Sequence, residues 1–155
     1  MEAAHAQRLT QALKNDIHKI YHARVKEYVG IDINYEDLYS ATNGAVSRYN
    51  HLKKILPGFG KVQYIQADGS IIFNSKEQEK KITNMSKENK NLLDKVFTKD
   101  KKFDIISSQF VIHYLFSDST SVKNLISNIQ NFLKKDGYIL LTLFDGDLVH
   151  KQFTD

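Results

Sequence analysis

Short runs of apolar residues alternate along this chain with longer segments whose apolar residues recur every three or four positions. The first pattern is typical of buried β-strands, and the second is typical of helices that bury one face. The first two predicted strands each end with an acidic residue close by, and the last one follows the tight turn Asp136-Gly137. In chain order, the predicted strands are Glu27–Ile33, Val62–Gly69, Phe103–Ser107 and Tyr138–Phe144.

Helical segments fill the spaces between these strands. The first is rich in Ala and contains neither Gly nor Pro, and Asn34 or Asp37 is placed to cap the second. Residues 76–102 are rich in Lys, Glu and Asn with sparse apolar anchors, which predicts an exposed helical insertion. The other predicted helices span residues 1–23, Tyr35–Ile55 and Ser121–Lys134.

Strands separated by helices predict βαβ units, in which right-handed crossovers join parallel strands. The predicted strands are short and nearly continuous in apolar residues, which is typical of a sheet covered on both faces. We therefore expect an α/β fold with a doubly wound, mostly parallel sheet. Residues 1–155 are expected to form a single domain, with residues 76–102 as its insertion.

Composition limits the classes of protein to consider. The 155 residues suffice for one domain, and the hydrophobic content of 41% is ordinary for a globular protein. No apolar run approaches the roughly 20 residues that span a bilayer, and residues 1–8 do not resemble a secretory signal. The absence of Cys excludes disulfides and thiolate metal sites. A net charge of +4 permits an anionic partner such as RNA, but it also fits a solvated surface rich in Lys.

Two acidic residues lie at the ends of the first two predicted strands. Because ligands of open α/β sheets bind beyond the carboxyl ends of the strands, Asp32 is placed to accept hydrogen bonds from ribose hydroxyls. It could instead answer the dipole of the following helix. Asp68 precedes Gly69 and could accept from an exocyclic amine such as adenine N6, or it could be a turn acid. Position alone leaves both alternatives open.

Four polar and aromatic residues follow the third predicted strand: Gln109, Phe110, His113 and Tyr114. If a helical turn begins at Gln109, Gln109 and His113 lie on one face, with Phe110 and Tyr114 on the adjacent face. Such residues singly are ordinary packing residues. Four together, beyond a strand at the place where ligands bind, favour a ligand site that offers an amide, an imidazole and rings.

Other patterns in the chain carry less chemistry. His18 and His22 have helical spacing, but no carboxylate or third ligand lies nearby, so no metal site is predicted. No G-x-G-x-x-G precedes Asp32, which disfavours a nicotinamide-dependent dehydrogenase. The Lys-rich residues 76–102 are interpreted as a solvated face, with RNA contact as the alternative.

Several segments together resemble one known family, the mRNA cap guanine-N7 methyltransferases, in particular the methyltransferase domains of capping enzymes from large DNA viruses. The resemblance covers roughly residues 15–153, and Gln109-Phe110-x-x-His113-Tyr114 is its most specific part. The other matching segments are Asp16-Ile17-His18-Lys19, Tyr28–Ile33, Ala67-Asp68, Phe103-Asp104-Ile105, Gly137–Thr142 and Asp145-Gly146-Asp147.

This resemblance implies a class I, Rossmann-like methyltransferase that uses S-adenosylmethionine and acts on the capped 5′ end of mRNA. It implies that Asp16 and Asp32 hold the methionine and ribose groups, that Asp68 meets the adenine amine, and that Gln109 lines the methyl-donor pocket. By the same resemblance, Phe110, His113 and Tyr114 face the cap guanine. Other domains or subunits of a capping enzyme are implied partners. The implied location is intracellular: the cytoplasm, viral factory or virion for a viral protein, and the nucleus for a cellular one.

One feature departs from the family. Its first strand ends in a Gly-rich loop just before the position of Asp16, whereas here Leu13-Lys14-Asn15 precede Asp16 and the first glycine is Gly30. We therefore expect a fragment or diverged chain that lacks the first strand and this loop, and that binds S-adenosylmethionine weakly or not at all by itself. Two alternatives follow: a degenerate, non-catalytic binding or stimulatory module, and another class I methyltransferase with a different acceptor.

Overall fold

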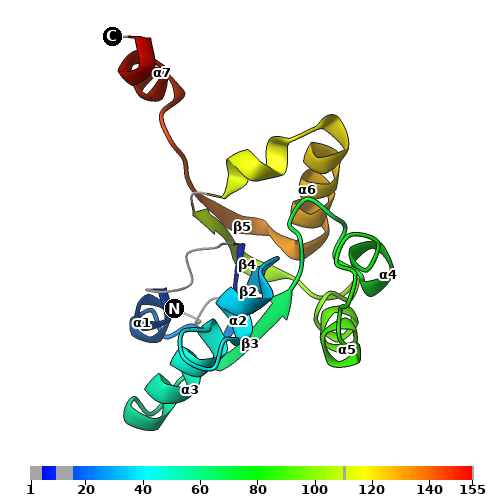
Figure 1. The fold of residues 1–155 in the computed structure, drawn as a ribbon. Helices are drawn as coiled ribbons and strands as arrows, with labels where there is room; N and C mark the ends of the chain where they lie inside the picture. The colour runs from blue at the N-terminus through cyan, green and yellow to red at the C-terminus, as the bar shows by residue number, and fades with distance from the viewer. Residues whose placement is uncertain (1–4, 10–15, 110, 155) are drawn as a thin grey trace.

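The computed structural model describes residues 5–9, 16–109 and 111–154, without the side chains of residues 5–9, 16, 113, 149, 153 and 154. Five parallel strands form one sheet in the order β3-β2-β1-β4-β5, with helices around it (Figure 1). The predicted α/β fold with a mostly parallel sheet is confirmed. The strands are β1 (His5–Leu9), β2 (Glu27–Asp32), β3 (Lys61–Gln66), β4 (Phe103–Gln109) and β5 (Leu133–Thr142).

Helices connect the strands as crossovers, which is why all described strands run in the same direction. Asn34 caps α2 by accepting from the Glu36 amide at 3.1 Å, and Asp118 caps α6 by accepting from the amides of Thr120 and Ser121. The helices are α1 (Asp16–His22), α2 (Tyr35–Tyr39), α3 (Ala45–Ile55), α4 (Ser75–Gln78), α5 (Lys87–Val96), the 3-10 helix η1 (Ile112–Phe116), α6 (Ser119–Phe132) and α7 (Gly146–Thr154).

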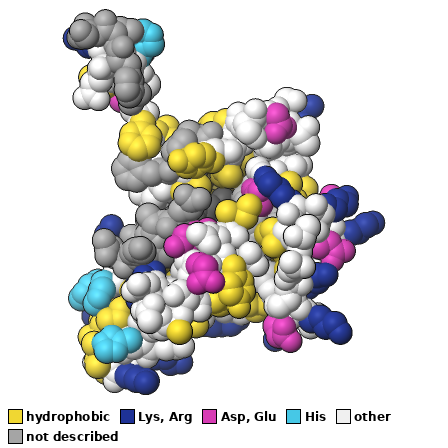
Figure 2. All heavy atoms as spheres, viewed as in Figure 1, with side chains coloured by type: hydrophobic (Ala, Val, Ile, Leu, Met, Phe, Trp, Pro, Cys, Tyr) yellow, Lys and Arg dark blue, Asp and Glu magenta, His cyan; other side chains and the backbone are white. Residues whose placement is uncertain are grey.

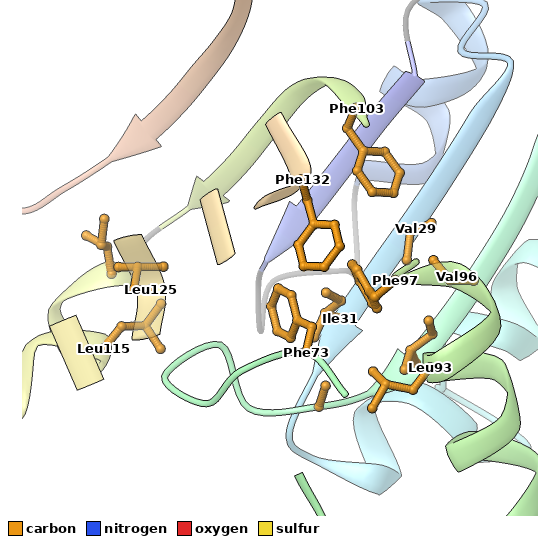
Figure 3. Close-up of a cluster of buried hydrophobic side chains, with 13 residues drawn as sticks. Val29, Ile31, Phe73, Leu93, Val96, Phe97, Phe103, Leu115, Leu125 and Phe132 are labelled. Carbon is orange, nitrogen blue, oxygen red and sulfur yellow. The ribbon is translucent and has the colours of Figure 1, made fainter. Parts of the chain in front are cut away.

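The sheet separates two hydrophobic clusters, because successive residues of β2 and β3 point to opposite faces. Val29 and Ile31 belong to the cluster under α5, α6 and η1, whereas Tyr28 belongs to the cluster under α1, α2 and α3. Figure 3 shows the first cluster, in which the Phe73 and Phe97 rings lie 4.7 Å apart between their centroids. Both faces of the sheet centre are therefore covered, as the apolar strands predicted.

The N-terminal prediction is wrong in part. Residues 1–23 were expected to be helical, but residues 5–9 form β1, and α1 begins only at Asp16. β1 is the middle strand, paired with β2 on one side and β4 on the other, so the expectation that the first strand is lacking is also wrong. Hydrogen bonding to two neighbouring strands outweighs the weak helical propensity of an Ala-rich segment. The expected position of the Gly-rich loop, residues 10–15, lies outside the described residues.

The C-terminal strand also differs from expectation. It begins at Leu133, directly after α6, and the Asp136-Gly137 turn becomes an irregularity within β5, where the register jumps between Phe103 and Ile105 of β4. A Cβ on Gly137 would lie 2.9 Å from the Asp104 carbonyl oxygen, so the close approach of the two strands requires glycine. β5 is an edge strand, and its large apolar side chains from Tyr138 to Leu141 are exposed rather than covered on both faces.

Two predicted helices are divided or more deeply packed than expected. The helix predicted over Tyr35–Ile55 is interrupted between α2 and α3 at residues 40–44. In the predicted insertion, α5 packs against the sheet, with Leu93 and Val96 buried in the first cluster. The apolar anchors thus connect much of this segment to the core, and full exposure is wrong for α5. Whether residues 76–102 are an insertion relative to other proteins stays a prediction.

None of the described helices is long and apolar enough to span a bilayer. α7 projects away from the sheet at the end of the chain (Figure 1).

Candidate functional site

A pocket of about 250 Å³ opens at the carboxyl ends of β2 and β3, beside the segment that follows β4. Strand order reverses around β1, and open α/β sheets bind ligands at the carboxyl edge near such a switch point. The loop after β4 reaches this pocket because Ile112 and Leu115 of η1 are anchored in the first cluster. Polar groups from three segments, Asp32, Asp68 and Tyr114, line the pocket beside apolar walls.

Asp32, the last residue of β2, is the pocket's unsatisfied polar group. It is only 3% exposed, and its Oδ1 accepts from the Asn34 amide at 2.9 Å. Its Oδ2 is buried and has no hydrogen-bond partner among the described residues. Burial raises the pKa of Asp32 to about 6, although the Asn34 amide opposes the shift. A buried acceptor without a donor is costly, so this oxygen is suited to a ligand that brings a hydroxyl or amine.

Asp68 lies beyond the end of β3 and is already satisfied by the protein. Its Oδ1 accepts from the amide and the hydroxyl of Ser70, at 2.8 and 2.7 Å, and its Oδ2 pairs with the ammonium of Lys81. Burial alone raises the pKa of Asp68, but Lys81 and Ser70 outweigh it and leave the pKa lowered. Lys81 comes from the segment after α4 and lines the pocket itself, so a cation sits beside the carboxylate there.

Side-chain amides hold the loop that carries Asp68. Gln78 is fully buried: its Oε1 accepts from the Asp68 amide at 2.8 Å, and its Nε2 donates to the Asp68 carbonyl at 2.9 Å. Asn128 of α6 donates to the Ile71 carbonyl at 2.8 Å, and Asn89 of α5 bonds to both backbone groups of Gln66. At and beyond the end of β3, these side-chain amides supply the hydrogen bonds that a neighbouring strand would otherwise supply to the backbone. Sequence reasoning missed them, because an amide in a polar segment carries no pattern of its own.

Gln109 and Tyr114 do not share the environment that was predicted for them. Gln109 is the last residue of β4, so the helical turn with His113 at its i+4 position is wrong. Its Nε2 donates to the Ser107 hydroxyl at 3.0 Å and its Oε1 accepts from Thr142 of β5, and it does not line the pocket. Tyr114, 63% exposed, lies on η1 at the pocket.

The structure describes the other predicted site residues only in part or not at all. Phe110 is outside the described residues, and the side chains of Asp16 and His113 are outside it as well. The backbone places Asp16 at the start of α1 and His113 within η1. Within the described part of the chain, no group of three or more His, Asp and Glu is arranged to hold a metal ion.

The pocket favours binding over acid–base catalysis. Two carboxylates face a small apolar space formed in part by Ile33 and Ala67, and this combination suits a flat molecule with hydroxyl and amine donors. A nucleoside has those groups. Among the described lining residues, the Ser70 hydroxyl donates to Asp68, but that carboxylate is already paired with Lys81. The arrangement therefore suits recognition and positioning.

The chain is similar in sequence to known proteins of mRNA capping. The chain is 41% identical over 137 residues to a probable mRNA-capping enzyme of Acanthamoeba polyphaga mimivirus, covering 88% of this chain and 12% of that protein. It is 39% identical over 59 residues to the mRNA cap guanine-N(7) methyltransferase of Caenorhabditis elegans, covering 38% and 15%. The chain thus spans less than a sixth of the length of these two relatives.

The fold has a counterpart of known structure. The N-methyltransferase NodS of Bradyrhizobium japonicum superposes on 90% of this chain and 57% of its own, with a TM-score of 0.53 and 16% identity. This likeness supports the fold, a parallel sheet of the class I methyltransferase type. Residues 13–155 match the model of the mRNA (guanine-N(7))-methyltransferase domain, and the chain belongs to that family.

Proposed function

We propose that this chain forms part of the methyl-donor and cap-binding core of an mRNA cap guanine-N7 methyltransferase. The observation that carries the proposal is the buried, unpartnered Oδ2 of Asp32 at the carboxyl edge of the sheet. Ribose hydroxyls would supply the donor that this oxygen lacks, so the residues present fit the nucleoside part of S-adenosylmethionine. The family match over residues 13–155 supports the same assignment.

Each predicted residue keeps a stated role in this proposal. Asp32 accepts from the ribose hydroxyls, and Asp68 accepts from the adenine amine beside Lys81. Asp16 at the start of α1 holds the methionine end, and Gln109 at the end of β4 lines the methyl-donor side of the site, outside the 250 Å³ pocket. The roles toward the cap guanine belong to Phe110, His113 and Tyr114, and Tyr114 is the one whose side chain is described at the pocket.

The proposed reaction needs positioning more than proton transfer. When bound, S-adenosylmethionine supplies a methyl group activated by its positively charged sulfur. Guanine N7 carries a lone pair, so methyl transfer would form the N7–carbon bond as the carbon–sulfur bond broke, and no proton would have to leave beforehand. The chain's residues would align donor and acceptor and exclude water, and the reaction would not need the hydrogen-bonded Ser70 and Asp68 as a nucleophile and a base.

Partners and place of action are part of the same proposal. The chain matches 12% of a viral capping enzyme, so other domains of such an enzyme are the proposed partners, and capped mRNA is the proposed substrate. A capping enzyme works where mRNA is made, and we place this chain inside the cell, in the cytoplasm if it serves a cytoplasmic virus.

A non-catalytic module of the same fold is the rival supported by a specific observation. No glycine precedes Gly30, so the backbone before Asp16 has a side chain at every position. Close approach of a ligand to that backbone is thereby hindered. We expect the 155-residue chain to bind S-adenosylmethionine weakly for this reason.

Because weak binding is expected, the test is an NMR titration of the chain with S-adenosylhomocysteine. Saturable shifts are expected at the amides of Asp32, Asp68 and Tyr114, and Asp32→Asn should weaken binding by about tenfold, the loss of one charged hydrogen bond. Glu36→Gln is the matched control, an exposed acid of α2 outside the pocket. Absence of shifts at millimolar ligand would favour the non-catalytic module.

A further inference from the structure

The opposite edge of the sheet, where the strands begin, carries a row of cations. Lys26 precedes β2, Lys61 opens β3, Lys101 and Lys102 precede β4, and Lys134 lies near the start of β5. Because the strands are parallel, these side chains gather at one edge, away from the pocket at the carboxyl ends.

Structural roles account for several of these cations. Lys61 and Lys101 both pair with Glu27, Lys134 pairs with Asp104, and Lys102 donates to the Asn131 carbonyl at the end of α6. The side chains of Arg24 and Lys26 are exposed and have no hydrogen bond or ion pair with a described residue. Both line one hollow, of about 480 Å³, between the end of α1 and residues 57–60.

Arg24 adopts a backbone conformation that normally favours glycine. Its φ is 52°, and it lies just beyond the last turn of α1, where glycine commonly ends a helix. A large cation at such a position is a reason to look for a function of its side chain.

The walls of the hollow are fixed and partly aromatic. Tyr21 and Phe59 line it, with ring centroids 4.8 Å apart. A Cβ on Gly60 would lie 2.2 Å from the Val25 carbonyl oxygen, so the loop is pressed against the turn that carries Arg24. The Tyr21 hydroxyl also donates to the Pro57 carbonyl at 3.2 Å.

We propose that this hollow binds single-stranded RNA, with Arg24 and Lys26 on phosphates and the Tyr21 and Phe59 rings against a base. Cations beside aromatic rings in a groove are the usual means of holding unpaired nucleotides without sequence readout. The identity of the polymer as RNA rests on the proposed function. The hollow would give the transcript a second contact with this chain, remote from the cofactor pocket.

The Lys-rich segment at α4 and α5 is the weaker candidate for this role. Figure 2 shows its Lys side chains on the surface over these helices, with acidic side chains among them. Lys80 pairs with Glu77 and Lys90 with Glu79, so much of its charge is neutralised locally. The hollow beside Arg24 has no such acids in its lining.

The test is fluorescence anisotropy of a labelled, uncapped single-stranded RNA of about 15 nucleotides, long enough for one such site, over a series of salt concentrations. The double variant R24E/K26E is expected to weaken binding by about tenfold or more and to flatten the log–log salt slope by about 1.4, the value for two lost phosphate contacts. The control K87E/K95E makes the same charge change on α5 and should retain wild-type affinity.

Arg24→Gly keeps the test sharp if the double variant fails to fold. It removes the cation and suits the backbone, so it should raise the thermal midpoint and still weaken RNA binding. Equal losses in R24E/K26E and K87E/K95E would overturn the proposal, as would absence of RNA binding by the wild-type chain at low salt. Competition by polyglutamate as effective as that by RNA would overturn it in favour of an acidic protein. No cofactor or cap enters the assay, so its result is independent of methyl transfer.

Discussion

Asp32 ends β2 and Asp68 follows the end of the neighbouring strand β3, yet their surroundings are opposite. Asp32 keeps a buried oxygen without a partner, and burial raises its pKa to about 6. Asp68 is 6% exposed, but three donors from Ser70 and Lys81 satisfy it and lower its pKa. A buried acid at a strand end is therefore not by itself a binding group. What matters is whether the protein has already supplied its donors.

The segments at these two acids, called here the Asp32 corner (residues 32–34) and the Asp68 corner (residues 67–70), also differ in the interactions that hold them in place. The Asp32 corner rests on β2 and on the cap of α2, where Asn34 donates its backbone amide to Asp32. The Asp68 corner is a loop fixed by side-chain amides, chiefly Gln78. The first depends on backbone structure and the second on particular side chains, so substitutions should separate them.

The largest effect is expected from Gln78→Ala. It would leave the Asp68 amide and carbonyl buried without partners and create a cavity, so the free energy of unfolding should fall by about 3 to 4 kcal/mol. Urea denaturation followed by circular dichroism measures this. Gln130→Ala, on the exposed face of α6, is the control and should change stability by less than about 0.5 kcal/mol. A loss at Gln78 no larger than at Gln130 would show that the amides do not hold the loop.

Replacing each acid by its amide should change stability in opposite directions at pH 7. Asp32→Asn removes a buried charge while an amide oxygen can still accept from Asn34, so a gain of about 1 kcal/mol is expected. Asp68→Asn loses the Lys81 pair and weakens the Ser70 hydrogen bonds, so a loss of about 2 kcal/mol is expected. Denaturation of both variants under one set of conditions measures the difference. Changes of the same sign would remove the contrast between the two corners.

Much of this contrast was beyond the reach of the sequence. The strand that ends at Asp32 and the strand that ends shortly before Asp68 could be predicted, because apolar runs mark buried strands and acids follow them. β1 could not, because its pairing with two other strands is a tertiary fact that an Ala-rich segment does not announce. Nothing in the spacing indicates that Lys81 pairs with Asp68, or that Gln109 stays in β4 bonded to Thr142.

The pH dependence of stability should distinguish the two acids, with an effect of about 2 kcal/mol. The raised pKa of Asp32 means that its protonated form is favoured by folding: this contribution is full below about pH 4 and is lost as the pH rises through about 6. The lowered pKa of Asp68 contributes stability above about pH 4 that is lost as the pH falls further. Between pH 4 and 7, Asp32→Asn should therefore flatten the stability curve and Asp68→Asn should leave its slope unchanged. If stability changed between pH 4 and 7 to the same extent in the wild type and in both variants, the assignment would be contradicted.

The smallest effect is expected from Lys81→Met, and it decides whether Asp68 can still serve a ligand. Lys81 is half exposed, so breaking its pair should lower the free energy of unfolding by less than about 1 kcal/mol. An adenine amine must share Oδ2 of Asp68 with the Lys81 ammonium. Removing the cation should therefore raise affinity for S-adenosylhomocysteine by about two- to fivefold, because the ligand no longer competes with the ion pair.

Lys80→Met is the matched control, because Lys80 is the adjacent residue, is similarly exposed and pairs with Glu77 outside the pocket. It should leave the affinity unchanged. If Lys81→Met weakens binding instead, the ammonium itself contacts the ligand, and Asp68 with Lys81 acts as one paired binding group. If affinity is unchanged in both variants, the ligand does not reach Oδ2 of Asp68, and Asp32 alone anchors it at this edge of the sheet.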